Sequence, residues 1–269
     1  MIPGNQKLQS SLRDLTIPTQ LARHRSTVVA LVGDRFLGQK SVAVELYRNE
    51  LHEADFIEME PGVDGSREVV EFSMTSPVGS SVKVILVDNA DRLSEPSQDA
   101  LLKLLESPPS LLSIVLVAYD TGALQPALAS RIRSELRWDH VSLDEMHEYA
   151  SSLLLPVSDT AIKMAMGLPE LYRIIVENGG FDELYDSIVS VAKREVSIMT
   201  KPPRVICDLE NGHNDTRDAI IHVIRYACKQ FFHDYSASLP ILRFCSVLSS
   251  STSANAEIHW TRMIADTRV

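Results

Sequence analysis

Cysteine is scarce in this chain, and the three that occur, Cys207, Cys228 and Cys245, are widely spaced. No Cys-x-x-Cys pair is present, so the sequence predicts neither a zinc module nor a disulfide framework. We therefore expect reduced cysteines and a cytoplasmic location.

Targeting signals and long apolar runs are also absent. No apolar stretch approaches the roughly 20 residues of a membrane-spanning helix. The N-terminus, Met1 to Gln6, lacks the basic-then-apolar pattern of a signal peptide. We therefore expect a protein that neither enters nor crosses a membrane.

An excess of positive charge is missing as well. The chain holds 26 Lys and Arg against 36 Asp and Glu, which gives a formal net charge of −10. Because phosphate contacts need clustered Lys and Arg, any contact with DNA should be local or shared with basic partners. Hydrophobic residues make up 45% of the 269 residues, enough for two or three small domains with buried cores.

Apolar runs alternate with helical patterns in the first half of the chain. Residues 1–25 read as a polar lead-in segment that packs against the first strand. We expect strands at residues 27–32, 55–59, 82–87 and 114–118, and helices at residues 39–51, 67–72 and 97–106. Strands that alternate with helices predict a parallel sheet covered on both faces.

Strand-like runs end after Trp138, and helical patterns replace them. Ser142 and Glu145 have the spacing of a capping box, with Ser142 as N-cap and Glu145 at N3. We expect helices at residues 143–154, 161–166, 181–199, 216–235, 240–250 and 254–266, and one that starts at Glu170. The predicted organisation is an α/β domain at residues 1–140, a small helical domain at 141–180 and a helical C-terminal domain at 181–269.

Between the first strand and the first helix, the chain reads G-D-R-F-L-G-Q-K-S over residues 33–41. A phosphate-binding loop has the pattern G-x-x-x-x-G-K-[ST]. Its glycines let backbone N–H groups wrap a phosphate, its Lys meets the β/γ charge and its hydroxyl ligates magnesium. Gly33 and Gly38 have this spacing, but Gln39 stands at the Lys position.

Lys40 and Ser41 come one residue too late for that pattern. One residue turns a helical side chain by about 100°, so we do not expect Lys40 to point into the loop. The segment is therefore either a structural relic of a phosphate loop or a weak nucleotide site.

The apolar run at residues 82–87 ends in Asp88 and Asn89. ATPases with a phosphate loop place Asp at this point for magnesium, and usually Glu next to it to orient the attacking water. Asn89 keeps the size of that Glu but cannot act as an effective base. By itself, Asp88 can also be read as an ordinary turn residue at the end of a strand.

Three segments together resemble the sliding-clamp-loader family of AAA+ proteins. They are K-V-I-L-V-D-N-A-D-R-L at residues 83–93, D-A-L-L-K-L-L-E-S-P-P at 99–109 and P-A-L-A-S-R-I at 126–132. The last resembles the family's Ser-Arg-Cys motif, with Ile132 in place of Cys. Arg23-His24 before the first strand also fits.

The resemblance is strong over residues 20–138 and points to the bacterial gamma/tau and delta-prime type of subunit. The inserted Cys-rich zinc module that some delta-prime subunits carry is absent from this sequence. The resemblance implies an AAA+ P-loop domain, then a small helical lid domain and an all-α, collar-type domain for oligomerisation.

The resemblance also implies a role for Arg131, which follows Ser130. In the family this Arg reaches the ATP site of a neighbouring subunit, where a cation stabilises the charge of phosphoryl transfer. The other reading is a solvated or salt-bridged surface charge, together with Arg133 and Arg137.

Both sensor positions of the family are altered. The first, usually Thr or Asn at the end of a strand, falls at Ala118 and Tyr119, with Thr121 nearby. The second, an Arg in the small helical domain, reads Glu170. Arg173 follows one turn later, as a substitute or as an ordinary charge on the helix surface.

Four elements of ATP turnover are thus altered while Ser130-Arg131 remains. We therefore expect a non-hydrolysing, delta-prime-like subunit of a DNA polymerase clamp loader. Its partners would be other loader subunits, one of which binds ATP and magnesium, the sliding clamp and primer–template DNA. One alternative is a working clamp-loader ATPase, and another is an AAA+-derived scaffold outside replication. The degenerate nucleotide site would comprise Gly33, Gly38, Lys40, Ser41, Asp88 and Asn89.

Overall fold

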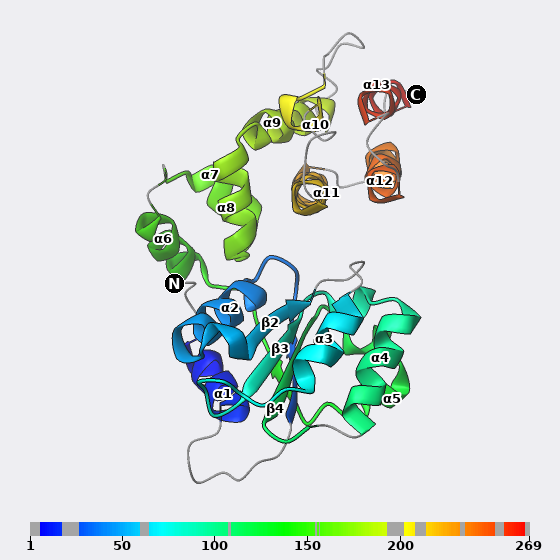
Figure 1. The fold of residues 1–269 in the computed structure, drawn as a ribbon. Coiled ribbons are helices and arrows are strands. Elements are labelled where there is room, and N and C mark those ends of the chain that lie inside the picture. The colour runs from blue at the N-terminus through cyan, green and yellow to red at the C-terminus, as the bar shows by residue number, and fades with distance from the viewer. Residues whose placement is uncertain are drawn as a thin grey trace. The chain divides into compact units, whose positions relative to one another are not determined.

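The computed structural model describes residues 6–17, 27–59, 65–106, 109–153, 155, 157–192, 202–207, 214–231, 235–250 and 256–266. The chain forms two compact units, Met1–Glu145 and Met146–Val269. The boundary falls within helix α6, Leu143–Ser152. Figure 1 shows the elements of both units.

The first unit alternates strands with helices. Its strands are β1 (Thr27–Val32), β2 (Phe56–Met59), β3 (Lys83–Val87), β4 (Leu112–Ala118) and β5 (Ser134–Arg137). Its α-helices are α1 (Gln6–Thr16), α2 (Gln39–Glu50), α3 (Gly65–Ser73), α4 (Glu95–Glu106) and α5 (Pro126–Ala129). Its 3-10 helices are η1 (Glu53–Asp55), η2 (Ala90–Arg92) and η3 (Thr121–Ala123).

The five strands form one parallel sheet in the order β2-β3-β4-β1-β5. β1 lies between β4 and β5, and Val29 pairs with Val115 on one side and Ser134 on the other. The strand order changes direction beside β1, and open α/β sheets bind ligands at the carboxyl ends of strands near such a point. The segments that follow β1 and β3 meet at this edge.

Residues that alternate along the strands fill two cores on opposite faces of the sheet. On one face Val29 of β1 packs with Leu12 of α1 and Tyr47 of α2. On the other face Val28 belongs to a cluster that includes Leu101 of α4. Figure 1 shows α1 and α2 on one side of the sheet and α3, α4 and α5 on the other, as the sequence predicted for a sheet covered on both faces.

Helix α1 and strand β5 are among the elements of this unit that the sequence prediction missed. The polar lead-in segment contains helix α1, which buries Leu12 completely, while Arg23 and His24 lie outside the described residues. Strand β5 is short, lies at the edge of the sheet, and alternates half-buried with exposed residues. Its sequence, S-E-L-R, has no apolar run, because an edge strand need not be apolar on both faces.

The second unit is helical. It contains the rest of α6 with α7 (Asp159–Ala165), α8 (Pro169–Asn178), α9 (Phe181–Ala192), α10 (Arg204–Cys207), α11 (Asn214–Phe231), α12 (Tyr235–Ser250) and α13 (Ala256–Asp266). Helix α11 packs against α9 and α12, and α12 packs against α13. Tyr185 and Tyr226 stack at 6.1 Å between ring centres, and Phe244 meets Trp260 edge-on at 5.7 Å. Within the described residues, no helix is long and apolar enough to cross a membrane.

The capping box at the start of α6 is confirmed. The N–H of Ser142 donates to Glu145 Oε2 at 3.0 Å, and the N–H of Glu145 donates to Ser142 Oγ at 3.4 Å. The hydrogen bonds from Ser142 lower the pKa of the Glu145 carboxyl. The prediction of a helix that begins at Pro240 is wrong, because α12 begins at Tyr235 and contains Pro240. The division of the helical part into two domains stays a prediction.

Two of the three cysteines are buried in this helical unit as free thiols, Cys228 and Cys245. Burial raises the pKa of Cys228 to about 11 and that of Cys245 to about 12. Both are therefore protonated at neutral pH and are poor nucleophiles. The side chain of Cys207 lies outside the described residues.

Candidate functional site

The loop between β1 and α2 is a tight turn against the end of β5. A Cβ on Gly33 would lie 2.7 Å from the carbonyl oxygen of Trp138, so only glycine fits there. Gly38 has φ of 92° and caps α2, and its carbonyl accepts the N–H of Val42 at 2.9 Å. Phe36 also has positive φ, 67°, which costs a non-glycine residue roughly 1 kcal/mol. The backbone conformation of the loop therefore requires both glycines, independently of any ligand.

Gln39 occupies the Lys position of the phosphate-loop pattern and turns into the loop. It is 5% exposed, and its Nε2 donates to the carbonyl oxygen of Asp34 at 3.2 Å. A Cβ on Gly33 would lie 3.0 Å from this Nε2 and 3.0 Å from Leu37 Cδ1. An uncharged amide therefore stands inside the loop where the pattern requires an ammonium.

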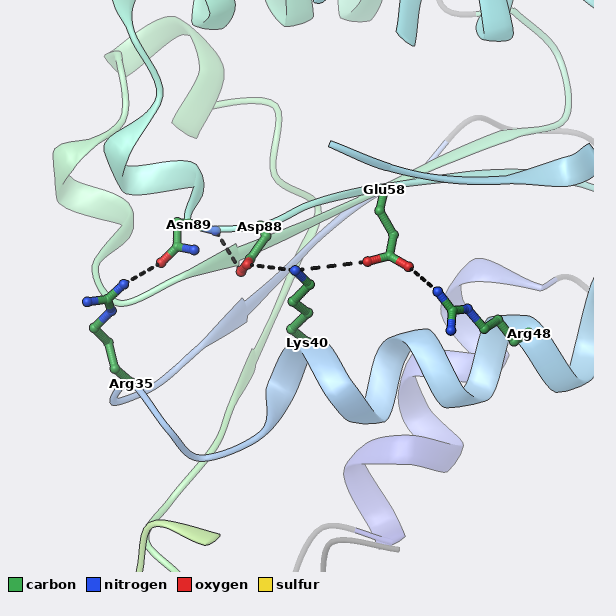
Figure 2. Close-up of polar contacts among 6 residues, drawn as sticks. All are labelled: Arg35, Lys40, Arg48, Glu58, Asp88 and Asn89. Atoms are coloured by element: carbon green, nitrogen blue, oxygen red, sulfur yellow. Dashed lines mark hydrogen bonds and ion pairs between the residues drawn. The ribbon is translucent and has the colours of Figure 1, made fainter. Parts of the chain in front are cut away.

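Lys40, in the first turn of α2, points to the end of β3. Its Nζ lies 3.2 Å from Asp88 Oδ2 and 3.9 Å from Glu58 Oε2. Glu58 also accepts a hydrogen bond from Arg48 at 2.9 Å. Figure 2 shows the resulting row of alternating charges, from Asp88 through Lys40 and Glu58 to Arg48.

Sequence reasoning selected Lys40 and Asp88 but missed Glu58 and Arg48. Glu58 belongs to β2, which pairs with β3 in the sheet, so the fold brings it beside Asp88. The signal in the sequence was a single acidic residue inside a short strand, which carries little information without the strand order.

Asn89 links the end of β3 to the loop. Its backbone is left-handed, with φ 45° and ψ 47°, a conformation that Asn tolerates better than most residues. Its N–H donates to Asp88 Oδ1 at 2.8 Å, and its Oδ1 accepts from Arg35 Nη2 at 3.1 Å. The residue at the position of a catalytic Glu thus connects to the loop through Arg35 (Figure 2).

A second contact holds the loop from the other side. His140, which follows β5, lies with Nε2 2.6 Å from Asp34 Oδ2. The sequence prediction had no role for this pair, since the two residues are far apart in the chain and β5 was not foreseen. The loop is therefore tied to both the β3 end and the β5 end of the sheet.

Magnesium and ATP need three groups from this edge of the sheet: an ammonium at the position of Gln39, a hydroxyl at that of Lys40 and a carboxylate at Asp88. The carboxylate is present, but the hydroxyl position carries a cation that is ion-paired with it. Among the described residues, no three His, Cys, Asp or Glu side chains gather into a metal site. These residues do not fit a magnesium–nucleotide complex, and no hydrolytic step follows from them. Ser41 is half-buried in the same turn of α2.

Ser130 and Arg131 lie apart from the loop, at the end of α5. Ser130 caps this helix, and its Oγ donates to the carbonyl of Ala127 at 2.9 Å. Arg131 Nη1 donates to the same carbonyl at 3.0 Å, while Nη2 lies 3.9 Å from Glu106 Oε1. The side chain of Arg131 is 35% exposed and that of Glu106 is 58% exposed.

Helix α4 supports the short helix that carries Arg131. Gln98 of α4 is buried, its Oε1 accepts the N–H of Gln125 at 2.8 Å, and its Nε2 donates to the carbonyl of Leu93 at 3.2 Å. Gln125 Nε2 also donates to Asp99 at 3.2 Å. Because Gln125 is the N-cap of α5, these bonds fix where the helix starts.

The two predicted sensor residues belong to different units. Thr121 begins η3 after β4, and its hydroxyl donates to Glu135 Oε1 at 3.3 Å. Arg173 is exposed on α8 in the second unit, where its charge acts on the buried Tyr149 hydroxyl. Burial raises the pKa of Tyr149, and the Arg173 charge opposes that rise. The described contacts of Thr121 do not include the loop.

Comparisons with known proteins agree on one family for the α/β unit. Residues 27–136 match the family described as DNA polymerase III, delta subunit. DNA polymerase III subunit gamma of Buchnera aphidicola (strain APS) is 38% identical over 69 residues, 26% of this chain and 19% of that protein. DNA polymerase III subunit gamma/tau of Mycobacterium bovis is 30% identical over 92 residues, 33% of this chain and 16% of that protein. The chain thus spans under a fifth of the length of these relatives.

A solved structure extends the likeness in fold to the helices. The DNA polymerase III gamma subunit-related protein of Thermotoga maritima has a TM-score of 0.57, 16% identity and 98% coverage of both chains. The likeness covers both the parallel α/β unit and the helices that follow it. Over residues 27–136, the chain thus resembles the delta and gamma/tau subunits of DNA polymerase III.

Proposed function

We propose that this chain is a cytoplasmic, non-hydrolysing clamp-loader subunit of the delta-prime kind. It presents Arg131 to the ATP site of a neighbouring subunit and helps to load a sliding clamp onto primer–template DNA. In this proposal residues 141–180 form the lid domain and residues 181–269 the collar-type domain that joins the other subunits.

One observation carries the proposal: groups of the chain itself engage the side chains of Gln39 and Lys40, whereas Ser130 is exposed and the side chain of Arg131 is 35% exposed. Gln39 and Lys40 are engaged with Asp34 and Asp88. Arg131 has only an exposed carboxylate and a backbone carbonyl as its described partners. A cation held this weakly can turn to a γ-phosphate, whose developing charge it stabilises in phosphoryl transfer.

The test uses a complex reconstituted from this chain, a gamma-type ATPase subunit, the sliding clamp and primed DNA. We expect the Arg131→Ala variant to assemble normally but to lower the DNA-stimulated ATPase rate and clamp loading. Arg133→Ala is the matched control, because Arg133 is an exposed cation two residues away. Equal rates for the wild type and Arg131→Ala would show that the arginine acts in no partner site.

The isolated chain distinguishes this role from that of a motor subunit. We expect no ATP hydrolysis by the chain alone. Steady hydrolysis that Asp88→Asn abolishes would assign it the gamma-type role instead. A failure to join any loader subunit or clamp would favour a scaffold outside replication.

A further inference from the structure

The ion pair between Lys40 and Asp88 lies where a phosphate-loop protein holds its metal. In the pattern G-x-x-x-x-G-K-[ST], the residue after the Lys supplies a hydroxyl to magnesium, and the Asp at the strand end faces the same ion. Counted from Gly33 and Gly38, that residue is Lys40. Its ammonium lies 3.2 Å from Asp88 Oδ2.

We propose that the Lys40 ammonium takes the place of magnesium in this loop, so that an internal cation closes the site to metal–nucleotide. The inference deepens the proposed function and rests on it for the expectation that this chain does not turn over ATP. It assigns the loss of metal binding at Asp88 to one side chain whose charge can be removed.

The Lys40 ammonium and a magnesium ion cannot both lie beside Asp88. Magnesium binds carboxylate oxygens at about 2.0–2.1 Å. An ion at that distance from Asp88 Oδ2, on the side that faces α2, would overlap the ammonium of Lys40 at 3.2 Å. Asp88 Oδ1 accepts the N–H of Asn89 at 2.8 Å, which restricts the second oxygen as well.

The charges around Lys40 also disfavour a bound divalent cation. Lys40 lies between two carboxylates, 3.2 Å from Asp88 and 3.9 Å from Glu58, and Arg48 holds the far oxygen of Glu58 at 2.9 Å. Two cations thus balance two carboxylates in this row. The side chains of Lys40, Asp88 and Glu58 are 31%, 16% and 27% exposed, so solvent screens them only partly. Without the Lys40 charge the row carries a net negative charge and would attract a divalent cation.

The test measures binding of Mn²⁺ to the full chain by electron paramagnetic resonance, with and without ATP. We expect no Mn²⁺ binding at the loop of the wild type. Lys40→Ser should create Mn²⁺ binding at the loop, and Gln39→Lys with Lys40→Ser should further make ATP binding depend on Mn²⁺. Adding Asp88→Asn should abolish both gains.

Two controls keep this test decisive. Arg48→Ser removes a cation from the same row but leaves Lys40, so it should not create a site at Asp88. Lys40→Met removes the charge and keeps most of the side-chain stem, and it should gain Mn²⁺ binding if Lys40→Ser fails to fold by circular dichroism. A wild type that binds Mn²⁺ at Asp88, or folded Lys40 variants that gain nothing, would overturn the inference.

The outcomes separate this inference from the proposed function. A gain of Mn²⁺ binding, with no effect of Arg131→Ala in the complex, would sink the proposed function alone. An effect of Arg131→Ala, with no gain in the Lys40 variants, would sink the internal-cation inference alone.

Discussion

Lys40 and Arg131 are both cations of the α/β unit, yet the fold holds them in different ways. Lys40 lies between the partly buried carboxylates of Asp88 and Glu58. Arg131 meets one backbone carbonyl and, at 3.9 Å, one exposed carboxylate. Exposed pairs of this kind contribute at most about 1 kcal/mol, so little free energy is lost when Arg131 leaves Glu106. The cation at the loop is held by two carboxylates of the chain, whereas the cation at the end of α5 has weaker described contacts.

The largest effect should come from replacement of Arg131, which follows α5. In the reconstituted complex, Arg131→Ala should slow ATP hydrolysis by about 10³-fold, the lower range for loss of an arginine finger. Arg131→Lys keeps the charge but loses the planar fork of donors, so it should restore only a small part of the rate. Single-turnover hydrolysis measures both. Full activity of Arg131→Lys would mean that any positive charge suffices there.

The next largest effect concerns the helix that presents Arg131. Leu128 of α5 is fully buried in the core that also contains Leu101 of α4. Leu128→Ala should lower the free energy of unfolding by about 2–5 kcal/mol, as large-to-small changes in cores do. Urea denaturation measures this loss. Leu143→Ala is the control, since Leu143 is 57% exposed, and a loss as large there would argue against the specific packing of α5.

A smaller effect should follow from removal of the internal cation. Lys40→Met leaves Asp88 and Glu58 without the charge between them, so stability at neutral pH should fall by about 1 kcal/mol. In a double-mutant cycle with Asp88→Asn, the two losses should not add. Strict additivity, measured by urea denaturation, would mean that the pair at 3.2 Å contributes no coupling.

The smallest effect should come from the partner of Arg131. Glu106→Gln should change the free energy of unfolding by less than about 0.5 kcal/mol, because the pair is exposed and long. The ATPase rate of the complex should stay within about twofold of the wild type, since Arg131 retains its charge and its backbone contact. A rate loss near that of Arg131→Ala would instead make Glu106 a positioning residue for the arginine.

Much of the α/β unit could be predicted from local patterns. The apolar runs before Gly33 and Asp88 are strands buried on both faces, and such strands are continuous in sequence. The capping box of Ser142 and Glu145 is likewise local, because both partners lie within one turn. Strand β5 and helix α1 were missed, because short polar elements depend on neighbours that are distant in the chain.

The sequence by itself determined where four of the five strands lie along the chain, the spacing of Gly33 and Gly38, and the replacement of the loop Lys by Gln39. These features follow from residue identity and periodicity along one segment. Only the tertiary structure decided that the Lys40 ammonium lies between Asp88 of β3 and Glu58 of β2. The physical reason is that an ion pair depends on distance in space. The pairing of β2 with β3 brings Glu58 and Asp88 close together, although they are far apart in the chain.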